Sequence, residues 1–148
     1  MTKIEDHHHA GLRFDWILVR EVSFEDNLSE DDSTTLSNLQ ATVDLKTSVS
    51  DDHRSCRTYL KVMLKPAEGA AAPFVRLAAA VEGQFSIEGE ATPSVAIDEF
   101  VRKQAPAILF PFLRQAVASA TSTSRFGQVL LPPINVVALV AEGARAGS

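Results

Sequence analysis

Four segments of the chain alternate apolar and polar residues with a period of two, and this pattern restricts the fold more than any other feature. The segments are residues 12–25, 39–49, 56–65 and 74–87. Because successive side chains of a strand point to opposite faces, each segment predicts a β-strand with one apolar and one polar face. Such strands are typical of an antiparallel sheet that packs a core on one side.

The first and fourth segments also predict which residues face the core. Every second residue of the first strand is expected to face the core, and these residues are Leu12, Phe14, Trp16, Leu18, Val22 and Phe24. Arg20 falls on the same row and is the one polar exception. Gly83 lies on the apolar row of the fourth strand, where an isolated glycine is expected to mark a bulge or a bend.

The connection between the first two strands predicts the strand order. Residues 26–38 form a mostly polar connection of 13 residues, which is too long for a tight hairpin. The shorter connections at residues 50–55 and 66–72 favour hairpins. We therefore expect a crossover that places the first strand beside the fourth, in the order 1-4-3-2.

Apolar residues recur at helical spacing after the fourth strand. Residues 95–104 predict a helical turn, and the long helix that follows has an apolar stripe formed by Phe112, Leu113, Ala116, Val117 and Ala120. Proline lacks the amide that a helix interior needs, and it restricts the residue before it. We therefore expect the long helix to begin between Pro106 and Pro111, with Pro111 in its first turn.

A second, shorter helix is expected near the end of the chain. Pro132 and Pro133 prevent the long helix from continuing, and Asn135 can cap a helix over residues 136–144. Strands followed by helices predict an α+β fold. It would have two layers, with a four-stranded antiparallel sheet covered on one face by a long and a short C-terminal helix.

Length and composition predict one domain, because 148 residues with 45% hydrophobic content can bury a real core. We expect a disordered lead-in at residues 1–10, a domain at 11–142 and a short tail at 143–148. Residues 7–9 are histidines, which cannot all face one metal ion from a strand or helix. Cys56 is the single cysteine and lies on the predicted core row, so we expect a buried, inert thiol in a reducing cytoplasm.

Charge and motif content disfavour several classes of function. Acids outnumber bases by 12 to 4 in residues 1–52, and the chain has a pI of about 5.3, which disfavours a nucleic-acid partner. The longest uncharged run has 16 residues, fewer than the ~20 that span a bilayer. No glycine-rich phosphate loop, metal-spaced cluster or nucleophile elbow is present. His53 with Cys56 is the one candidate pair of base and nucleophile, and structural roles are favoured for both. We expect a soluble protein that is not an enzyme and uses no cofactor.

Four stretches together carry a resemblance to a known family. They read VSFED at residues 22–26, GQFSIEG at 83–89, ILFPFLR at 108–114 and VLLPPIN at 129–135. In this order and with compatible gaps, residues 14–139 resemble the SecB family of protein-export chaperones. The resemblance implies a cytoplasmic, ATP-independent holdase that is a homotetramer, built as a dimer of dimers. Such a protein binds unfolded precursor proteins and passes them to the translocase ATPase SecA.

The resemblance also suggests which residues bind clients. In the family, non-native polypeptide occupies apolar grooves between the crossover loop, the sheet and the last helix. The candidate groove residues here are Leu28, Leu36, Val136, Val137 and Val140. Phe110, Phe112 and Val117 are assigned instead to the core or a subunit interface.

The face that SecA contacts in the family is only partly matched. Glu21 and Glu25 match the acids near the end of the first strand, but the fourth-strand acid aligns with Ala78, beside Arg76. The residues assigned to SecA binding are therefore Glu21, Glu25 and Arg76. The tail is also shorter and less acidic than is usual in the family. An alternative is therefore a SecB-like chaperone or adaptor that is not coupled to SecA and serves a narrow client such as an antitoxin.

Overall fold

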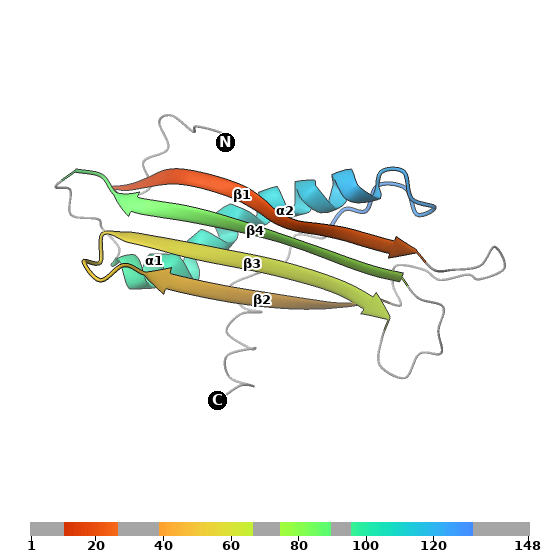
Figure 1. Ribbon diagram of the computed structural model, residues 1–148, viewed down its shortest axis with the longest axis horizontal. Helices are drawn as coiled ribbons and strands as arrows, with labels where there is room; N and C mark the ends of the chain where they lie inside the picture. The colour runs from red at the N-terminus through yellow and green to blue at the C-terminus, as the bar shows by residue number, and fades with distance from the viewer. Residues whose placement is uncertain (1–10, 27–38, 67–74, 90–95, 132–148) are drawn as a thin grey trace.

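The computed structural model describes residues 11–26, 39–66, 75–89 and 96–131 of the chain. It contains, in chain order, β1 (Leu12–Asp26), β2 (Leu39–Val49), β3 (Ser55–Pro66), β4 (Val75–Ile87), α1 (Ile97–Lys103) and α2 (Ala105–Thr121). The strands form one antiparallel sheet in the order β1-β4-β3-β2 (Figure 1). The predicted α+β class and strand order are both confirmed. The lead-in at residues 1–10 and the short helix expected at 136–144 lie outside the described residues.

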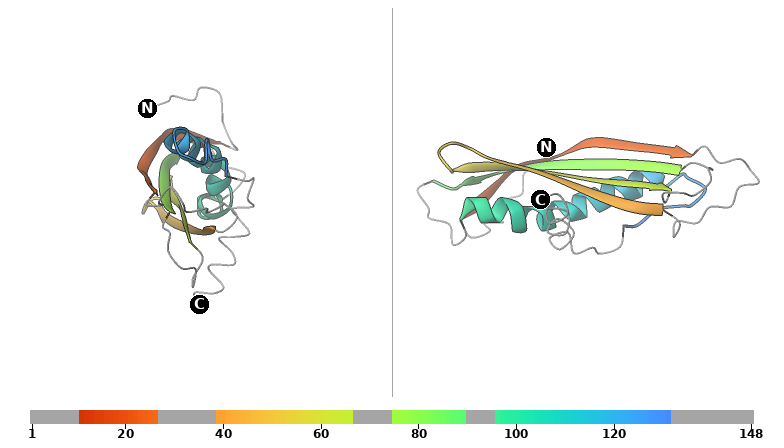
Figure 2. Two further views of the ribbon diagram at one scale, coloured as in Figure 1. Left: turned by 90° about the vertical axis from the view of Figure 1, so that its right-hand side faces the viewer. Right: turned by 90° about the horizontal axis from the view of Figure 1, so that it is seen from below.

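The two helices lie on the same face of the sheet, so the molecule has two layers (Figure 2). We call this face of the sheet the inner face and the opposite one the outer face. The core lies between the layers, where the largest fully buried side chains include Leu60, Val81 and Phe85 from the strands and Phe100, Leu109 and Leu113 from the helices. The Phe85 ring meets Phe100 edge to face, with centroids 5.2 Å apart. The alternating strands therefore bury one face, as their pattern predicts.

The sequence suggested a bulge or a bend at Gly83, but β4 has no bulge at this position. Gly83 pairs in register with both neighbouring strands. A Cβ atom at this position would lie 2.9 Å from Cδ2 of Leu109 and 3.1 Å from the ring of Phe85. Glycine is therefore needed here because α2 packs close against the sheet.

The bulges lie instead in β1. Its register against β4 shifts by one residue between Phe14 and Trp16, and again between Val19 and Glu21. Because one extra residue exchanges the two faces of a strand, Ile17 and Val19 join the inner row between the two shifts. The expected core positions of Trp16 and Leu18 were therefore wrong. They pair with Gln84 and Glu82 and lie on the outer face.

The long helix begins earlier than predicted. Gln104 ends α1 and precedes α2, and its backbone remains in the right-handed helical region, so the two helices follow one another with only a bend. Pro106 occupies the first turn of α2, where an amide would be unpaired in any case, whereas Pro111 lies inside the helix. Pro111 and Ala107 are both exposed. Because Pro111 has no backbone N–H, the Ala107 carbonyl lacks its usual hydrogen-bond donor within the helix. Since this position is exposed, water can donate to that carbonyl instead.

Leu113→Ala should lower the free energy of unfolding by about 2–5 kcal/mol, because it removes a side chain that is 1% exposed at the centre of the core. Urea denaturation measures this loss. Leu18→Ala is the matched control and should cost clearly less, since Leu18 lies on the outer face. A loss below about 1 kcal/mol for Leu113→Ala would show that this side of α2 is loosely packed.

Candidate functional site

The sequence-predicted client-binding residues lie outside the part of the chain that the structure describes. Leu28 and Leu36 fall in residues 27–38, and Val136, Val137 and Val140 fall in residues 132–148. Their assignment to a groove remains a prediction.

The residues predicted to contact SecA are described, and they lie on the outer face. Glu21 forms an ion pair with Lys61 at 2.9 Å, and Glu25 forms one with Arg76, also at 2.9 Å. The hydrogen bond to Glu21 raises the pKa of Lys61 above its ordinary value. Asp26, at the end of β1 and on its inner row, pairs with Arg125 at 2.7 Å. The acids that sequence comparison singled out are therefore each matched by a neighbouring cation.

An apolar groove of about 580 Å³ lies between β1 and α2. We call it the β1–α2 groove, and it is lined by Ile17, Val19 and Val22 from β1 and by Phe112, Gln115, Ala116, Ser119 and Ala120 from α2. Val19 is 55% exposed and Val22 is 43% exposed, which is unusual for valines on the inner face of a sheet. Three of the five residues of the predicted α2 stripe, Phe112, Ala116 and Ala120, thus face this groove. The other two, Leu113 and Val117, are buried in the core.

Sequence reasoning missed Ile17 and Val19 as members of this groove. Strict alternation placed them on the polar side of the strand, and no residue type in the segment signals the bulge that exchanges the two rows. The helical stripe of Phe112, Ala116 and Ala120 was the available signal for its other wall.

A second hollow of about 440 Å³ lies on another side of α2. It is lined by Phe110, Pro111, Arg114, Gln115 and Ala118 from the helix and by Gln128 and Leu130 from the segment after it. Leu130 is 56% exposed. The Nε atom of Arg114 is buried and has no hydrogen-bond partner within the described residues. Buried guanidinium nitrogens are normally satisfied, so this side of α2 offers both apolar area and an unused donor.

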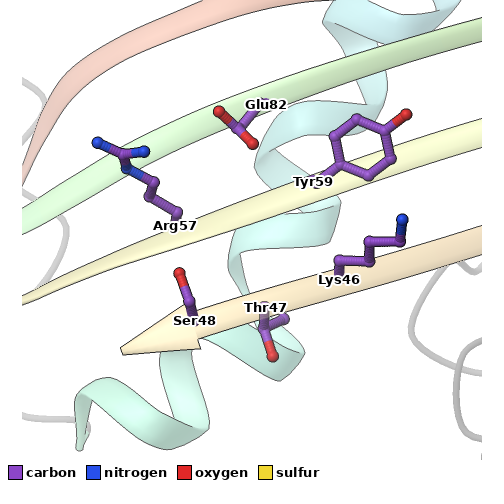
Figure 3. Close-up of a pocket in the computed structure, with 6 residues that line it drawn as sticks. All are labelled: Lys46, Thr47, Ser48, Arg57, Tyr59 and Glu82. Carbon is purple, nitrogen blue, oxygen red and sulfur yellow. The ribbon is translucent and has the colours of Figure 1, made fainter. Parts of the chain in front are cut away.

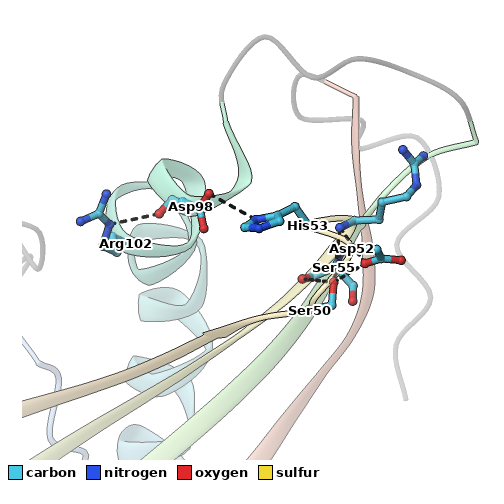
Figure 4. A network of polar contacts seen from close by, with 7 residues as sticks. Ser50, Asp52, His53, Ser55, Asp98 and Arg102 are labelled. Atoms are coloured by element: carbon cyan, nitrogen blue, oxygen red, sulfur yellow. Dashed lines mark hydrogen bonds and ion pairs between the residues drawn. The ribbon is translucent and has the colours of Figure 1, made fainter.

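A polar network ties the β2–β3 hairpin to α1 (Figure 4). The Ser50 hydroxyl donates to Asp52 at 2.6 Å, and this bond together with the Arg54 amide lowers the pKa of Asp52. His53 has a left-handed backbone with φ of 56°, and its Nδ1 atom lies 3.5 Å from Asp98 of α1. Both side chains are more than half exposed, so this contact lies at the surface. The arrangement is that of a hairpin tip held against a helix.

Cys56 is buried, with 2% of its surface exposed. Burial raises the pKa of the thiol from about 9 to about 12, and the negative charges of Asp15 and Asp98 contribute in the same direction. Because the thiolate is the reactive form, this cysteine is a poor nucleophile at neutral pH. The expected buried thiol is therefore confirmed.

Native Cys56 should react with iodoacetamide at pH 8 at least roughly 100-fold more slowly than the urea-unfolded chain, because the fold both covers the thiol and suppresses its ionisation. Mass spectrometry of timed samples measures the two rates. The folded state keeps its proton between pH 9 and 12 while the unfolded state loses it, so this group's contribution to stability should fall as the pH rises through that range. Rapid modification of the native protein would contradict the buried position.

The described ranges contain neither a metal-binding cluster nor a membrane-spanning helix. Within them, no three His, Cys, Asp or Glu side chains gather closely enough to hold a metal ion. None of the helices that the structure describes is long and apolar enough to cross a membrane.

Comparison with known proteins identifies relatives over nearly the full chain. A family model described as preprotein translocase subunit SecB matches residues 5–146. An uncharacterised protein of Methanocaldococcus jannaschii is 27% identical over 133 residues, covering 89% of this chain and 84% of the relative. The protein-export protein SecB of Afipia carboxidovorans is 40% identical over 60 residues, which span 40% of this chain and 36% of that relative.

A solved structure has the same fold. It is a SecB-like chaperone of Mycobacterium tuberculosis, in complex with a peptide from the antitoxin HigA1, and it superposes with a TM-score of 0.59 at 12% sequence identity. The match covers 84% of this chain and 91% of that one. At this identity the likeness concerns the fold alone.

Proposed function

The chain belongs to the SecB family, and on that basis we propose that it is an ATP-independent chaperone that holds non-native precursor proteins and delivers them to the export translocase. The chaperone role follows from the family. The holdase mechanism, a cytoplasmic location and delivery to the translocase are our inferences. Clients would bind in the groove to which Leu28, Leu36, Val136, Val137 and Val140 are assigned.

The observation that best supports this proposal is the apolar surface beside α2. The two hollows that flank the helix expose Val19, Val22 and Leu130, and the described residues offer nothing that covers them. Contiguous apolar surface of this kind marks sites of association rather than ordinary monomer surface. We assign it to contacts between copies, which would form a homotetramer as a dimer of dimers and supply the Arg114 Nε atom with an acceptor.

Assembly would also explain how a holdase keeps apolar surface available. A single domain of this size tends to bury such surface within itself, whereas rigid contacts between copies leave grooves that the core cannot fill. The excess of acids in residues 1–52 would keep the assembly in solution and attract client segments rich in apolar and basic residues.

Light scattering on the purified protein should give a mass near four subunits, and the mass should rise when a reduced, unfolded client is added. The same protein should suppress client aggregation without nucleotide. Val19→Asp should lower the mass, because it places a charge in the β1–α2 groove. Ser23→Asp adds the same charge to the outer face of β1 and should leave the mass unchanged. A strictly monomeric parent with no effect on aggregation would refute the holdase proposal.

A second candidate is a SecB-like chaperone or adaptor that is not coupled to SecA. The neutralisation of Glu21 by Lys61 and of Glu25 by Arg76 favours it, because a basic partner would meet ion pairs instead of free carboxylates. Ala78, which aligns with an acid in the family, points the same way. The client of such an adaptor would be a narrow class of protein.

Calorimetry with purified SecA separates the two candidates. If pairing blocks the acids, the parent should bind SecA weakly, and Lys61→Gln with Arg76→Gln should strengthen binding by about tenfold because both carboxylates are released. Lys103→Gln, which removes the same charge from α1, should have no effect. Tight binding by the parent that is abolished by Glu21→Lys with Glu25→Lys would instead establish coupling through these acids and exclude the second candidate.

A further inference from the structure

The outer face has an unexpected balance of charge. Every acid on β1 and β4 forms an ion pair with a basic residue, and on β4 this acid is Glu82, which binds Arg20 at 2.8 Å. On β2, Asp44 lies opposite Lys61 in the register. In contrast, Lys46 and Arg57 form no ion pair with any described residue. The centre of the outer face therefore presents two cations that no carboxylate of the described residues contacts directly.

Aromatic rings hold these two cations in place. The Arg57 guanidinium lies 5.4 Å from the centre of the Trp16 ring, and its Nε atom donates to the Gln84 side chain at 2.9 Å. The Lys46 ammonium lies 5.5 Å from the centre of the Tyr59 ring. Such contacts fix a cation without neutralising it, so less side-chain entropy is lost when an anion binds.

A hollow of about 460 Å³ lies between the two cations (Figure 3). It is lined by Lys46, Thr47, Ser48, Arg57, Tyr59 and Glu82. The Glu82 carboxylate is already engaged by Arg20. Hydroxyl groups of Ser48 and Tyr59 add hydrogen-bonding capacity beside the two positive charges.

The spacing of the cations fits an extended peptide. Lys46 pairs with Tyr59, and Arg57 is two residues along β3 from Tyr59, so Lys46 and Arg57 are diagonal neighbours on one face of the sheet. The backbone positions of diagonal neighbours are about 7–8 Å apart. The charged ends point apart from there, because the guanidinium lies by Trp16 of β1 and the ammonium lies over Tyr59 of β3 (Figure 3). Side chains at positions i and i+2 of an extended segment lie on one side and are about 6.6–6.8 Å apart. A segment with an acid at every second position presents a row of carboxylates on one side, so a different carboxylate of that row can meet each cation.

We infer that the outer face docks an extended, acidic protein segment whose carboxylates alternate with other residues, through Lys46 and Arg57. This partner is distinct from the apolar, non-native clients of the proposed chaperone activity, and the inference does not depend on that activity. Nucleic acid is the less suitable polyanion, since Glu82 and Asp44 lie on the same face and would repel a continuous phosphate backbone.

A synthetic peptide with glutamate alternating with threonine tests the inference. It should bind the full chain in calorimetry at roughly 0.05 M salt, and binding should weaken as salt screens the charges. Trp16 is the only tryptophan of the chain, so its fluorescence should change on binding and locate the site. Lys46→Gln with Arg57→Gln should weaken binding by at least about tenfold, whereas Lys103→Gln on α1 should leave it unchanged.

Three results would overturn the inference. The first is no binding at low salt, or equal binding of the peptide with glutamine in place of glutamate. The second is binding that leaves Trp16 fluorescence unchanged and persists in the double variant, which would place the peptide elsewhere. The third is tight binding of a short single-stranded oligonucleotide with none of the peptide, which would identify a nucleic-acid site instead. Suppression of client aggregation, measured on the same double variant, reports separately on the chaperone proposal.

Discussion

Leu109 of α2 packs directly over Gly83 of β4, at a point where a side chain on β4 would collide with it. This close approach sets the distance between the helical layer and the sheet. Because α2 lies close, Leu113 and Val117 reach the inner face farther along the helix, and α1 can place Phe100 against Phe85. The missing Cβ atom at one position thus determines how the whole core is filled.

Much of the fold could be predicted from the sequence because its strands alternate cleanly. The pairing of β2 with β3 has no register shift, so periodicity alone assigned their faces correctly. Prediction failed where a backbone irregularity carries no residue signature. Nothing in the sequence around Asp15 or Arg20 announces a bulge, and Pro111 looks like a boundary although solvent exposure lets it remain inside α2. The role of Gly83 was missed because it depends on a helix 26 positions away in sequence, at Leu109.

The candidate site was less accessible to sequence reasoning than the fold was. The resemblance located Glu21 and Glu25 correctly on an exposed face, but the charge that a partner meets depends on their cross-strand neighbours. Lys61 and Arg76 belong to other strands, and only the register brings them beside these acids. In the same way, Lys46 and Arg57 become neighbours only after β2 and β3 have paired. Charge counted along the chain is thus a poor guide to charge on the surface.

The two bulges of β1 together determine which of its side chains face the core. One extra residue inverts the facing of every position that follows, and a second restores it. Only the side chains from Trp16 to Val19 therefore point to the faces opposite to those that strict alternation predicts. The side chains at both ends of the strand point to the predicted faces. A pair of single-residue insertions can in this way move an aromatic residue from the interior of a sheet to its surface and leave the flanking packing intact. Related chains could gain or lose an entire recognition surface by this route, without any substitution in the core.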